Sequence, residues 1–315
     1  MKTRTPTPVA TAPASAGASP TPAASRSVRR TGGAGRLAPY GFLLPAYALF
    51  VLAVLYPILI TAQISLYRWS PLPGAVQTFV GLDNYTRALQ DSHFWLSMVN
   101  VAVYLLVTVP GQVVIGLFVA LLLNRKLPGR TVFRVLFYLP VVTSWVVVSL
   151  LFRYLFTTEG GLVNWALGTD IAWLDNRWTA LAALCALGIW KGIGWTAVIL
   201  LAGLQGISED LHEAASLDGA GRLRRLWHIT LPGLRRNLLF VTVLLVIGSF
   251  QVFISVLLMT SRGPAGQTEV PLTYVYQQAF EFLDFGYGSA LALIMTVLVL
   301  VLSIVQTVFV NQVEK

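Results

Sequence analysis

The sequence predicts an all-α membrane protein with six transmembrane helices. Of its 315 residues, 56% are hydrophobic and only 11% are charged, whereas about a quarter of the residues of a soluble globular domain carry a charge. The hydrophobic residues form long runs rather than short periodic segments, and the basic residues gather between those runs. Together these observations indicate a chain that is solvated largely by lipid.

Residues 1–37 differ in composition from the rest of the chain. They are rich in Ala, Pro, Thr, Ser and Gly, with six basic residues and no acidic residue. Such a segment cannot bury enough apolar surface to offset the entropy lost on ordering, so we expect a disordered basic tail. The apolar run that follows is too long for a signal peptide and lacks a cleavage site, so it is expected to remain as a membrane anchor.

Six stretches are long enough to cross the membrane as helices, which requires about 20 apolar residues. Pro110 and Pro140 fall inside the second and third stretches, where neighbouring helices can bond the carbonyls that a proline frees. We therefore expect a single transmembrane domain, residues 38–315, without a separate soluble domain. The stretches are Tyr40–Tyr67, Phe94–Leu123, Val132–Phe156, Thr179–Leu204, Leu238–Thr260 and Tyr287–Val310.

The distribution of Lys and Arg predicts the orientation of these helices. With a cytoplasmic N-terminus, 16 of the 22 basic residues lie on the cytoplasmic side, five lie outside, and Lys191 lies within the fourth span. Cytoplasmic loops carry an excess of Lys and Arg, so both termini are expected in the cytoplasm. The basic residues form no single amphipathic face, which argues against nucleic-acid binding.

The loop at about residues 206–235, after the fourth span, predicts two short helices joined by a glycine. Ser208 is a good N-cap and is followed by an acidic first turn, and Gly219 suits the left-handed residue that ends a helix. A second helix with a basic face is expected to end at Pro232. From the residues alone, this pair of helices could lie on the inner leaflet or dock onto a cytosolic partner.

This loop resembles a motif of a known family. Glu213-Ala-Ala, Gly219 and Ile229-x-Leu231-Pro232 are similar to the EAA motif of inner-membrane permeases of binding-protein-dependent ABC importers. The resemblance extends over about residues 38–310, and further strings are similar to the carbohydrate branch of the first maltose permease and the glycerol-phosphate permease. These strings are Phe79-Val-Gly-Leu-Asp-Asn-Tyr85, Leu123-Asn-Arg-Lys126, Leu201-Ala-Gly-Leu-Gln205, Asp218-Gly-Ala220, Gly263-Pro-Ala-Gly266 and Phe285-Gly-Tyr-Gly-Ser-Ala290.

The resemblance implies a permease subunit that forms half of the translocation path for a sugar, either a di- or oligosaccharide or a glycerol-phosphate-type solute. In the family the two short helices are coupling helices that fit a cleft on a cytosolic ATPase. The glutamate matching Glu213 contacts a basic residue there, and the glycine matching Gly219 permits the turn. The residues expected to couple to the ATPase are Glu213, Ala214, Ala215, Asp218, Gly219, Ile229, Leu231 and Pro232.

The resemblance also implies an assembly in the inner (cytoplasmic) membrane. Its members are a second permease subunit that completes a heterodimer, two copies of a cytosolic ABC ATPase and an extracytoplasmic solute-binding protein. The sequence has no Gly-x-x-x-x-Gly-Lys-Ser/Thr loop, so ATP and Mg²⁺ are expected on the ATPase and neither a cofactor nor enzyme activity on this chain. The three histidines are scattered over separate loops, so no metal site is expected.

Polar residues inside the predicted spans are candidates for the sugar path. Lys191 lies midway along the fourth span, where burial costs at least ~2.5 kcal/mol, so it should face the interior or an aqueous path. It could line the path or simply bond a carbonyl or another subunit. Side-chain amides and hydroxyls can bond sugar hydroxyls, and an indole can stack on a sugar ring, but each could equally bond a neighbouring helix. The other path candidates are Asn100, Ser144, Trp145 and Gln251, followed by Gln112, Trp195 and Ser255.

Two other functional classes fit the sequence less well. An ion-coupled transporter normally carries internal repeats and buried acidic residues, whereas no predicted span of this chain contains an acidic residue. A membrane-bound transferase would need metal-binding carboxylates within the spans, and these are also missing. Co-purification of an ATPase subunit separates the permease from both alternatives.

Overall fold

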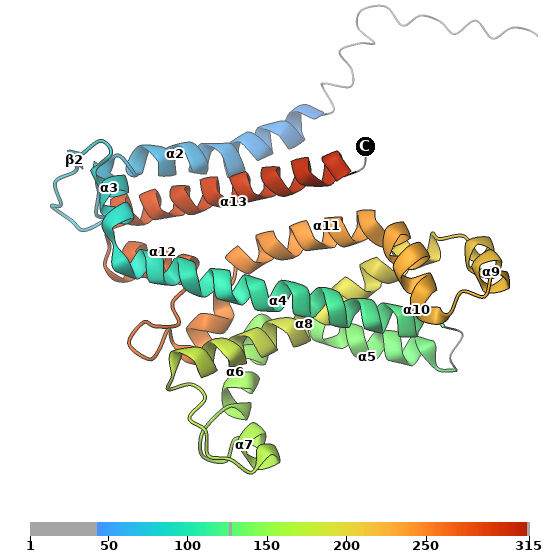
Figure 1. Ribbon diagram of the computed structural model, residues 1–315. Coiled ribbons are helices and arrows are strands. Elements are labelled where there is room, and N and C mark those ends of the chain that lie inside the picture. Colours follow the sequence, from blue (N-terminus) through green and yellow to red (C-terminus); the bar gives the residue numbers. More distant parts are fainter. Residues whose placement is uncertain (1–42, 126–127, 314–315) are drawn as a thin grey trace, which may run out of the picture. The chain divides into compact units, whose positions relative to one another are not determined.

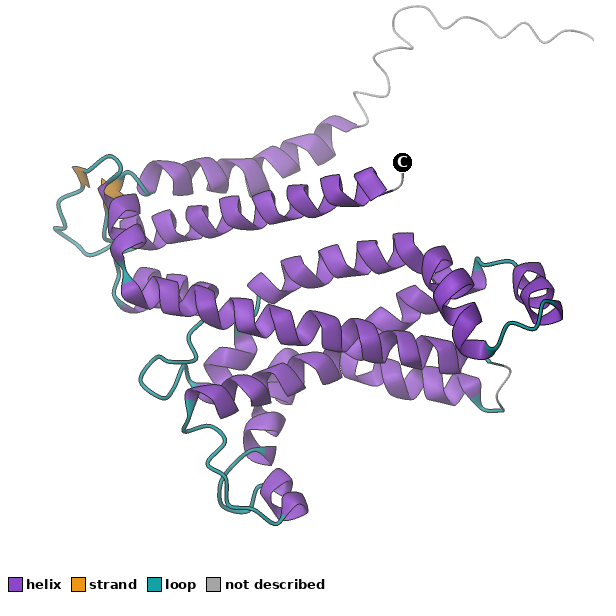
Figure 2. Cartoon of the chain, viewed as in Figure 1, coloured by secondary structure: helices purple, strands orange, loops and turns teal. Residues whose placement is uncertain are grey.

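The computed structural model describes residues 43–125 and 128–313, which are mostly helical (Figure 2). The chain divides into two compact units, residues 1–55 and 56–315. The described part of the first unit is helical from Leu43 and ends in the π-helical turn η1 (Val51–Leu55). The predicted disordered tail lies outside the described residues.

The second unit consists of helices joined by loops and one two-stranded antiparallel hairpin, in which Tyr67 pairs with Phe79 (Figure 1). Its first elements are α2 (Tyr56–Ile64), β1 (Tyr67–Arg68), β2 (Thr78–Phe79), α3 (Asp83–Gln90), α4 (Ser92–Asn124), α5 (Arg130–Val142), α6 (Trp145–Leu155) and α7 (Leu162–Leu167). The remaining elements are α8 (Arg177–Gln205), α9 (Glu209–Leu217), α10 (Arg222–Arg225), η2 (Leu226–Thr230), α11 (Leu231–Phe250), η3 (Val256–Thr260), α12 (Pro271–Tyr276), η4 (Gln277–Glu281) and α13 (Phe285–Val313).

Five helical segments in the described part of the chain are long and apolar enough to cross a membrane, or up to six if the bent pair α5 and α6 counts as one span. This agrees with the predicted all-α membrane class. The five segments are Leu43–Ile64, Ser92–Asn124, Arg177–Gln205, Arg222–Phe250 and Phe285–Val308.

The predicted third span, Val132–Phe156, is wrong as a single helix because α5 and α6 meet at a bend of 95°. Pro140, near the end of α5, supplies no N–H to the helical hydrogen-bond ladder. Ser144 then starts a new helix, since its side chain accepts a hydrogen bond of 3.3 Å from the Val146 N–H. Pro110, in contrast, lies inside the uninterrupted helix α4.

The predicted fifth span, Leu238–Thr260, is displaced along the chain, because the helical segment runs Arg222–Phe250. The prediction that Pro232 ends a separate short helix is therefore also wrong. The π-helical turn η2 comes directly before it, with the Leu231 N–H bonded to the Leu226 carbonyl. This wider turn places the proline in the first turn of α11, where its missing N–H costs little.

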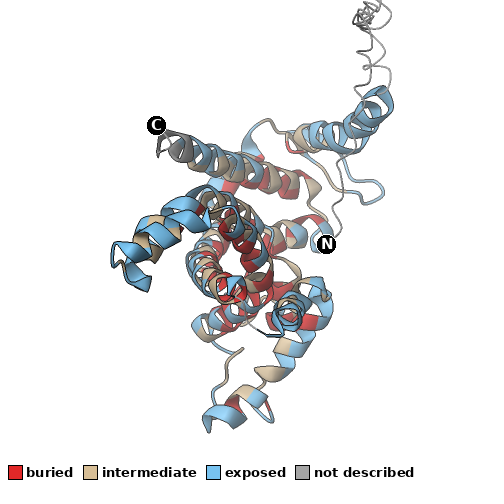
Figure 3. Ribbon diagram, turned by 90° about the vertical axis from the view of Figure 1, so that its right-hand side faces the viewer, coloured by how far each residue is buried: buried red, intermediate tan, exposed pale blue. Residues whose placement is uncertain are grey.

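The core of the bundle lies between α4, α8 and α11, which contribute one cluster of buried aliphatic side chains. Figure 3 shows the buried residues gathered on the inward faces of the helices, while the outward faces are exposed. α5 packs on α8 but has no buried residue of its own. Such exposed apolar faces are expected where lipid or another subunit covers a helix.

The segment Phe79–Tyr85, one of the strings similar to the carbohydrate branch, holds together the end of the bundle opposite α9 (Figure 1). The Asn84 amide donates hydrogen bonds to the carbonyls of Ser65 (2.8 Å) and Tyr67 (3.0 Å), and the Tyr85 hydroxyl lies 2.7 Å from Ser65 Oγ. Gly286, from another of the strings, approaches so closely that a Cβ there would lie 2.1 Å from the Tyr67 carbonyl oxygen. These two strings therefore join α2, α3 and α13 structurally.

Candidate functional site

Helix α9 has the start and the end that the sequence predicted. The Ser208 side chain accepts a hydrogen bond of 3.2 Å from the Asp210 N–H, which caps the first turn. Gly219 has a φ of +75°, and the Ala220 N–H bonds the Ala215 carbonyl at 2.8 Å across it. This is the hydrogen-bond pattern of a Schellman motif, which requires a left-handed residue at the glycine.

None of the side chains of α9 is buried. Leu217 is 90% exposed and Leu223 on α10 is 69% exposed. Arg225 Nη1 bonds the His212 carbonyl at 3.4 Å, which ties the two short helices together. Of the predicted coupling residues, Glu213, Ala214, Asp218, Gly219 and Pro232 are exposed, while Ala215, Ile229 and Leu231 are half-buried.

A polar cavity of 540 Å³ separates α9 from the ends of α4 and α8. Glu209, Glu213 and His212 line it from α9, and Arg225 lines it from α10. Glu213 therefore carries its carboxylate on an accessible surface near a basic residue. A helix mounted over such a cavity can contact a partner without disturbing the bundle core.

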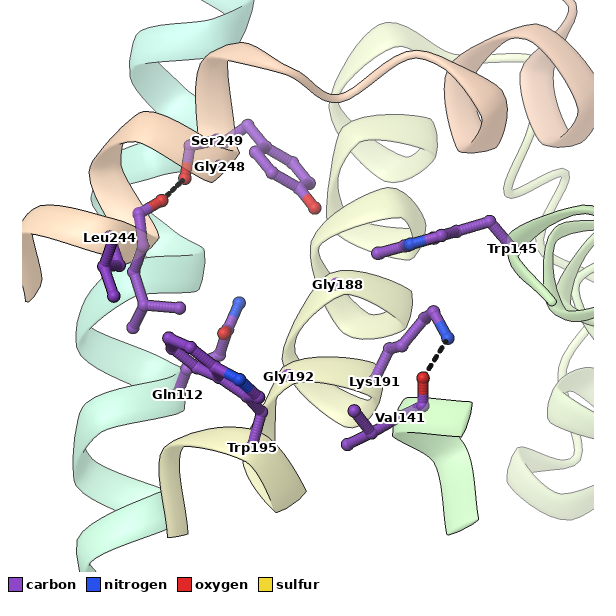
Figure 4. Close-up of a pocket in the computed structure, with 12 residues that line it drawn as sticks. Gln112, Val141, Trp145, Gly188, Lys191, Gly192, Trp195, Leu244, Gly248 and Ser249 are labelled. Carbon is purple, nitrogen blue, oxygen red and sulfur yellow. Dashed lines mark hydrogen bonds between the residues drawn. The ribbon is translucent and has the colours of Figure 1, made fainter. Parts of the chain in front are cut away.

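Two adjoining cavities lie within the bundle, beside the bend between α5 and α6, and Figure 4 shows the first of them. They measure 230 Å³ and 280 Å³ and share Tyr104, Trp145 and Gly248 in their linings, so they lie next to each other. Their walls come from α4, α5, α6, α8 and α11 together with residues 251–255, which follow α11. A cavity lined by aromatic residues and a few polar groups is typical of a small-molecule site.

The predicted path residues divide between these cavities and the surrounding structure. Trp145 lines both cavities, Lys191 lines the first and Gln251 lines the second. Ser144 caps α6, and neither it nor Asn100 is in either lining. Of the further candidates, Gln112 and Trp195 line the first cavity and Ser255 the second.

Lys191 is 5% exposed and bonds the end of α5. Its Nζ donates hydrogen bonds to the carbonyls of Thr143 (2.7 Å) and Pro140 (2.8 Å) and lies 4.8 Å from the centre of the Trp145 ring. Both carbonyls lie where α5 ends and its backbone N–H donors run out, and the Pro140 carbonyl also accepts a hydrogen bond of 2.6 Å from the Thr143 hydroxyl. A cation there offsets the negative end of the helix dipole. Lys191 therefore connects α8 to the bend.

Replacing Lys191 by methionine is expected to destabilise the protein, because the carbonyls at the end of α5 lose their charged donor. Hydrogen bonds to charged groups contribute about 1.5–3 kcal/mol each, so we expect a loss of about 2 kcal/mol or more. The midpoint of thermal unfolding in detergent measures this effect. Lys191→Arg, which keeps a cationic donor, serves as the control, and an unchanged midpoint in the methionine variant would contradict the assignment.

Asn100 is fully buried and joins three parts of the chain. Its Nδ2 donates to the carbonyls of Gln267 (2.8 Å) and Glu269 (2.7 Å), and its Oδ1 accepts a hydrogen bond of 2.8 Å from Arg177. It thereby ties α4 to the loop before α12 and to the first residue of α8. These bonds occupy both the amide nitrogen and the carbonyl oxygen of the Asn100 side chain, so Asn100 holds the loop rather than facing the cavities.

Sequence reasoning missed a cluster around Asp91. One carboxylate oxygen of Asp91 accepts from the His93 N–H (2.9 Å), and the other accepts from the hydroxyls of Tyr274 and Tyr287 (2.6 Å for Tyr287). Burial raises the pKa of Asp91, but the hydrogen bonds from the two tyrosines and the backbone outweigh burial and lower it overall. An acidic residue directly before an apolar run is a helix N-cap signal, and this signal could have identified Asp91. No sequence pattern could have paired it with the two tyrosines, because they lie on helices far away in the chain.

Glu269 lies close to this cluster and is 4% exposed. Burial raises the pKa of Glu269 to about 7, and the negative charges of Glu281 and Asp91 reinforce this shift. Arg262, whose Nη1 lies 3.9 Å from Glu269 Oε1, opposes it. The charged form of Glu269 is therefore disfavoured in the folded protein.

Glu269→Gln is expected to flatten the dependence of stability on pH. The folded-state pKa of about 7 lies above the ordinary value of 4.5. The stabilising contribution of the neutral form is therefore full below pH 4.5 and is lost as the pH rises through 7. Thermal unfolding midpoints between pH 5 and 8 should fall with pH in the wild type and change less in Glu269→Gln. Glu159→Gln, the same change at an exposed loop position, is the control, and parallel profiles for wild type and Glu269→Gln would contradict the prediction.

Comparison with known proteins places the chain among transport components. Residues 112–315 match the family described as binding-protein-dependent transport system inner membrane component. The chain is 35% identical to the probable ABC transporter permease protein YurN of Bacillus subtilis, over 87% of the chain and 96% of that protein. It is 36% identical to the sulfoquinovosyl glycerol transport system permease protein SmoG of Agrobacterium fabrum, over 82% of the chain and 86% of that protein.

Two further similarities concern a sugar permease and a solved structure. The chain is 34% identical to the lactose transport system permease protein LacF of Rhizobium radiobacter, over 84% of the chain and 91% of that protein. Its fold is similar to a chain of a bacterial ABC transporter involved in the import of the acidic polysaccharide alginate, with a TM-score of 0.78. That match has 21% sequence identity and covers 90% of this chain and 98% of the other.

Proposed function

The chain belongs to the family of binding-protein-dependent transport system inner membrane components, and on that premise we propose that it imports a saccharide as a permease subunit coupled to a separate ATPase. The observation that carries the proposal is the exposed helix α9, capped at Ser208 and ended at Gly219, which lies within the matched residues. Relatives named for the transport of sulfoquinovosyl glycerol and lactose support a saccharide as the substrate.

α9 and α10 dock into a cleft of the cytosolic ATPase. Glu213 pairs there with a basic residue, and the exposed side chains of Leu217 and Leu223 provide apolar anchoring. Gly219 fixes the angle between the two helices, so that movement of the ATPase is passed to the bundle. Hydrolysis of ATP with Mg²⁺ takes place on the ATPase.

The end of the bundle that carries α9 faces the cytoplasm, together with both termini. This orientation follows from the 16 basic residues on that side against five on the other. The chain provides one half of the pore, and a second permease subunit provides the other half. Two ATPase copies bind on the inside, and a solute-binding protein delivers the sugar from the outside.

The two adjoining cavities form this chain's share of the sugar path. Trp145 and Gln251 offer an aromatic face and an amide at their walls, and Lys191 holds the bend that places Trp145 there. Closure of the ATPases favours the outward-open state, and their separation after hydrolysis favours the inward-open state. A ligand that binds one of two global states more tightly is sufficient to drive such a cycle.

Reconstitution tests the proposed function. The chain, its permease partner and the ATPase are assembled in proteoliposomes with the cognate binding protein, and uptake of radiolabelled saccharides is measured with and without ATP. Uptake should require ATP, the ATPase and the binding protein. Uptake by this chain alone, driven by an ion gradient, would contradict the proposal.

A further inference from the structure

Two polar side chains on α4 face the first cavity without a hydrogen-bond partner. Gln112 is 8% exposed and Tyr104 is 6% exposed, and both line the cavity of 230 Å³. Within residues 43–125 and 128–313, no hydrogen bond joins the Gln112 amide or the Tyr104 hydroxyl to another protein group. Neither group is among the fully enclosed unpaired polar atoms of the described residues, so both open onto the cavity and a polar ligand there can bond them directly.

Two glycines of α8 make room for these polar groups. A Cβ on Gly192 would lie 2.0 Å from Gln112 Oε1, and a Cβ on Gly188 would lie 2.3 Å from the Tyr104 hydroxyl oxygen. Gln112 and Tyr104 are eight residues apart, which places them on nearby faces two turns along α4. The close approach of α8 therefore holds both groups at the cavity wall instead of leaving them free to turn into lipid.

Among the described residues of this chain, the lining of the two cavities offers no unpaired positive charge. Among the described residues that line them, Lys191 is the only one with a charged side chain. Its ammonium is already bonded to the carbonyls of Pro140 and Thr143 and lies against the Trp145 ring. A carboxylate or sulfonate entering the cavity would lose water without gaining a free positive partner, which is costly.

The remaining wall suits the apolar face of a sugar. Trp145 and Trp195 both line the first cavity, and their indole faces can stack on the C–H face of a pyranose (Figure 4). The Gln112 amide has one acceptor and one donor group side by side, which match two neighbouring hydroxyl groups. The Tyr104 hydroxyl can bond a third.

We propose that the saccharide carried by this chain is neutral, and that Gln112 and Tyr104 select it by bonding its hydroxyl groups. This inference rests on the proposed function. Gln112 is the main determinant because it can bond two hydroxyls at once, and Tyr104 adds one further bond. A saccharide with a carboxylate or sulfonate at the position that meets the cavity is rejected.

The test uses the complete importer in proteoliposomes with its binding protein. Uptake and ATP hydrolysis are measured together for lactose, maltose and trehalose and for two acidic probes, sulfoquinovosyl glycerol and an alginate disaccharide. We expect uptake of a neutral probe. Gln112→Met keeps the side-chain volume but removes both hydrogen-bonding groups, and should lower the number of sugar molecules moved per ATP about tenfold. Tyr104→Phe should lower it several-fold. Gln63→Met, the same change at an exposed position of α2, is the control.

The outcomes separate this inference from the proposed function. ATP-dependent uptake of the acidic probes in preference to the neutral ones would overturn the neutral class and leave the importer function standing. Wild-type sugar moved per ATP in Gln112→Met would overturn the selecting role of Gln112. A general folding defect would lower ATP hydrolysis and uptake in parallel, whereas a weakened sugar site lowers uptake and spares hydrolysis. Uptake that does not depend on ATP would contradict the proposed function itself.

Discussion

Glu213→Lys is expected to abolish ATP-dependent uptake while the protein remains in the membrane. Glu213 is exposed on α9, a helix with no buried residue, so the change leaves the packing of the bundle intact. In the proposed complex the lysine would face a basic residue of the ATPase. Loss of one partner of such a pair costs about 2–5 kcal/mol, and repulsion adds to this, so uptake should fall at least about a hundredfold.

Three measurements check this prediction. The amount of protein in the membrane should be unchanged, co-purification of the ATPase should be lost, and uptake of labelled sugar should fall to background. Glu209→Lys, the same charge reversal one turn earlier on α9, is the matched control and should retain most of the uptake. Equal loss in both variants, or normal uptake in Glu213→Lys, would contradict a specific contact at Glu213.

Gly219→Val should also remove most uptake, for a different reason. Gly219 has a φ of +75°, and an L-residue in the left-handed region costs about 1–2 kcal/mol, more for a β-branched side chain. The surrounding space is open, because a Cβ there meets no atom within 4 Å. The penalty is therefore one of backbone conformation, and the chain would relieve it by changing the angle between α9 and α10. We expect uptake to fall at least about tenfold.

Gly219→Asn is the matched control, because asparagine tolerates the left-handed conformation better than other non-glycine residues. It should keep most of the uptake although it adds a side chain of similar size to valine. Uptake assays on membranes with equal amounts of the two variants make the comparison. If valine and asparagine had the same effect, the backbone explanation would be wrong.

Local patterns in the sequence were sufficient for the features that depend on neighbouring residues. The six apolar stretches predicted the membrane class because a helix must satisfy its own backbone groups in lipid. Ser208 and Gly219 predicted the bounds of α9 because capping and left-handed backbone depend on single residue types. The proline signals were less informative. Pro110 lies in a continuous helix, whereas Pro140 comes before a bend of 95°.

The sequence by itself determined the class of protein, the family and the bounds of α9, because each depends on composition or on residues close together in the chain. Only the tertiary structure decided which polar residues share a wall. It showed that Lys191 bonds the end of α5, that Asn100 holds a loop, and that Gln112 faces a cavity without a partner. The physical reason is that a buried polar group finds its partners on other helices, and helix periodicity gives its face but not the helix it meets.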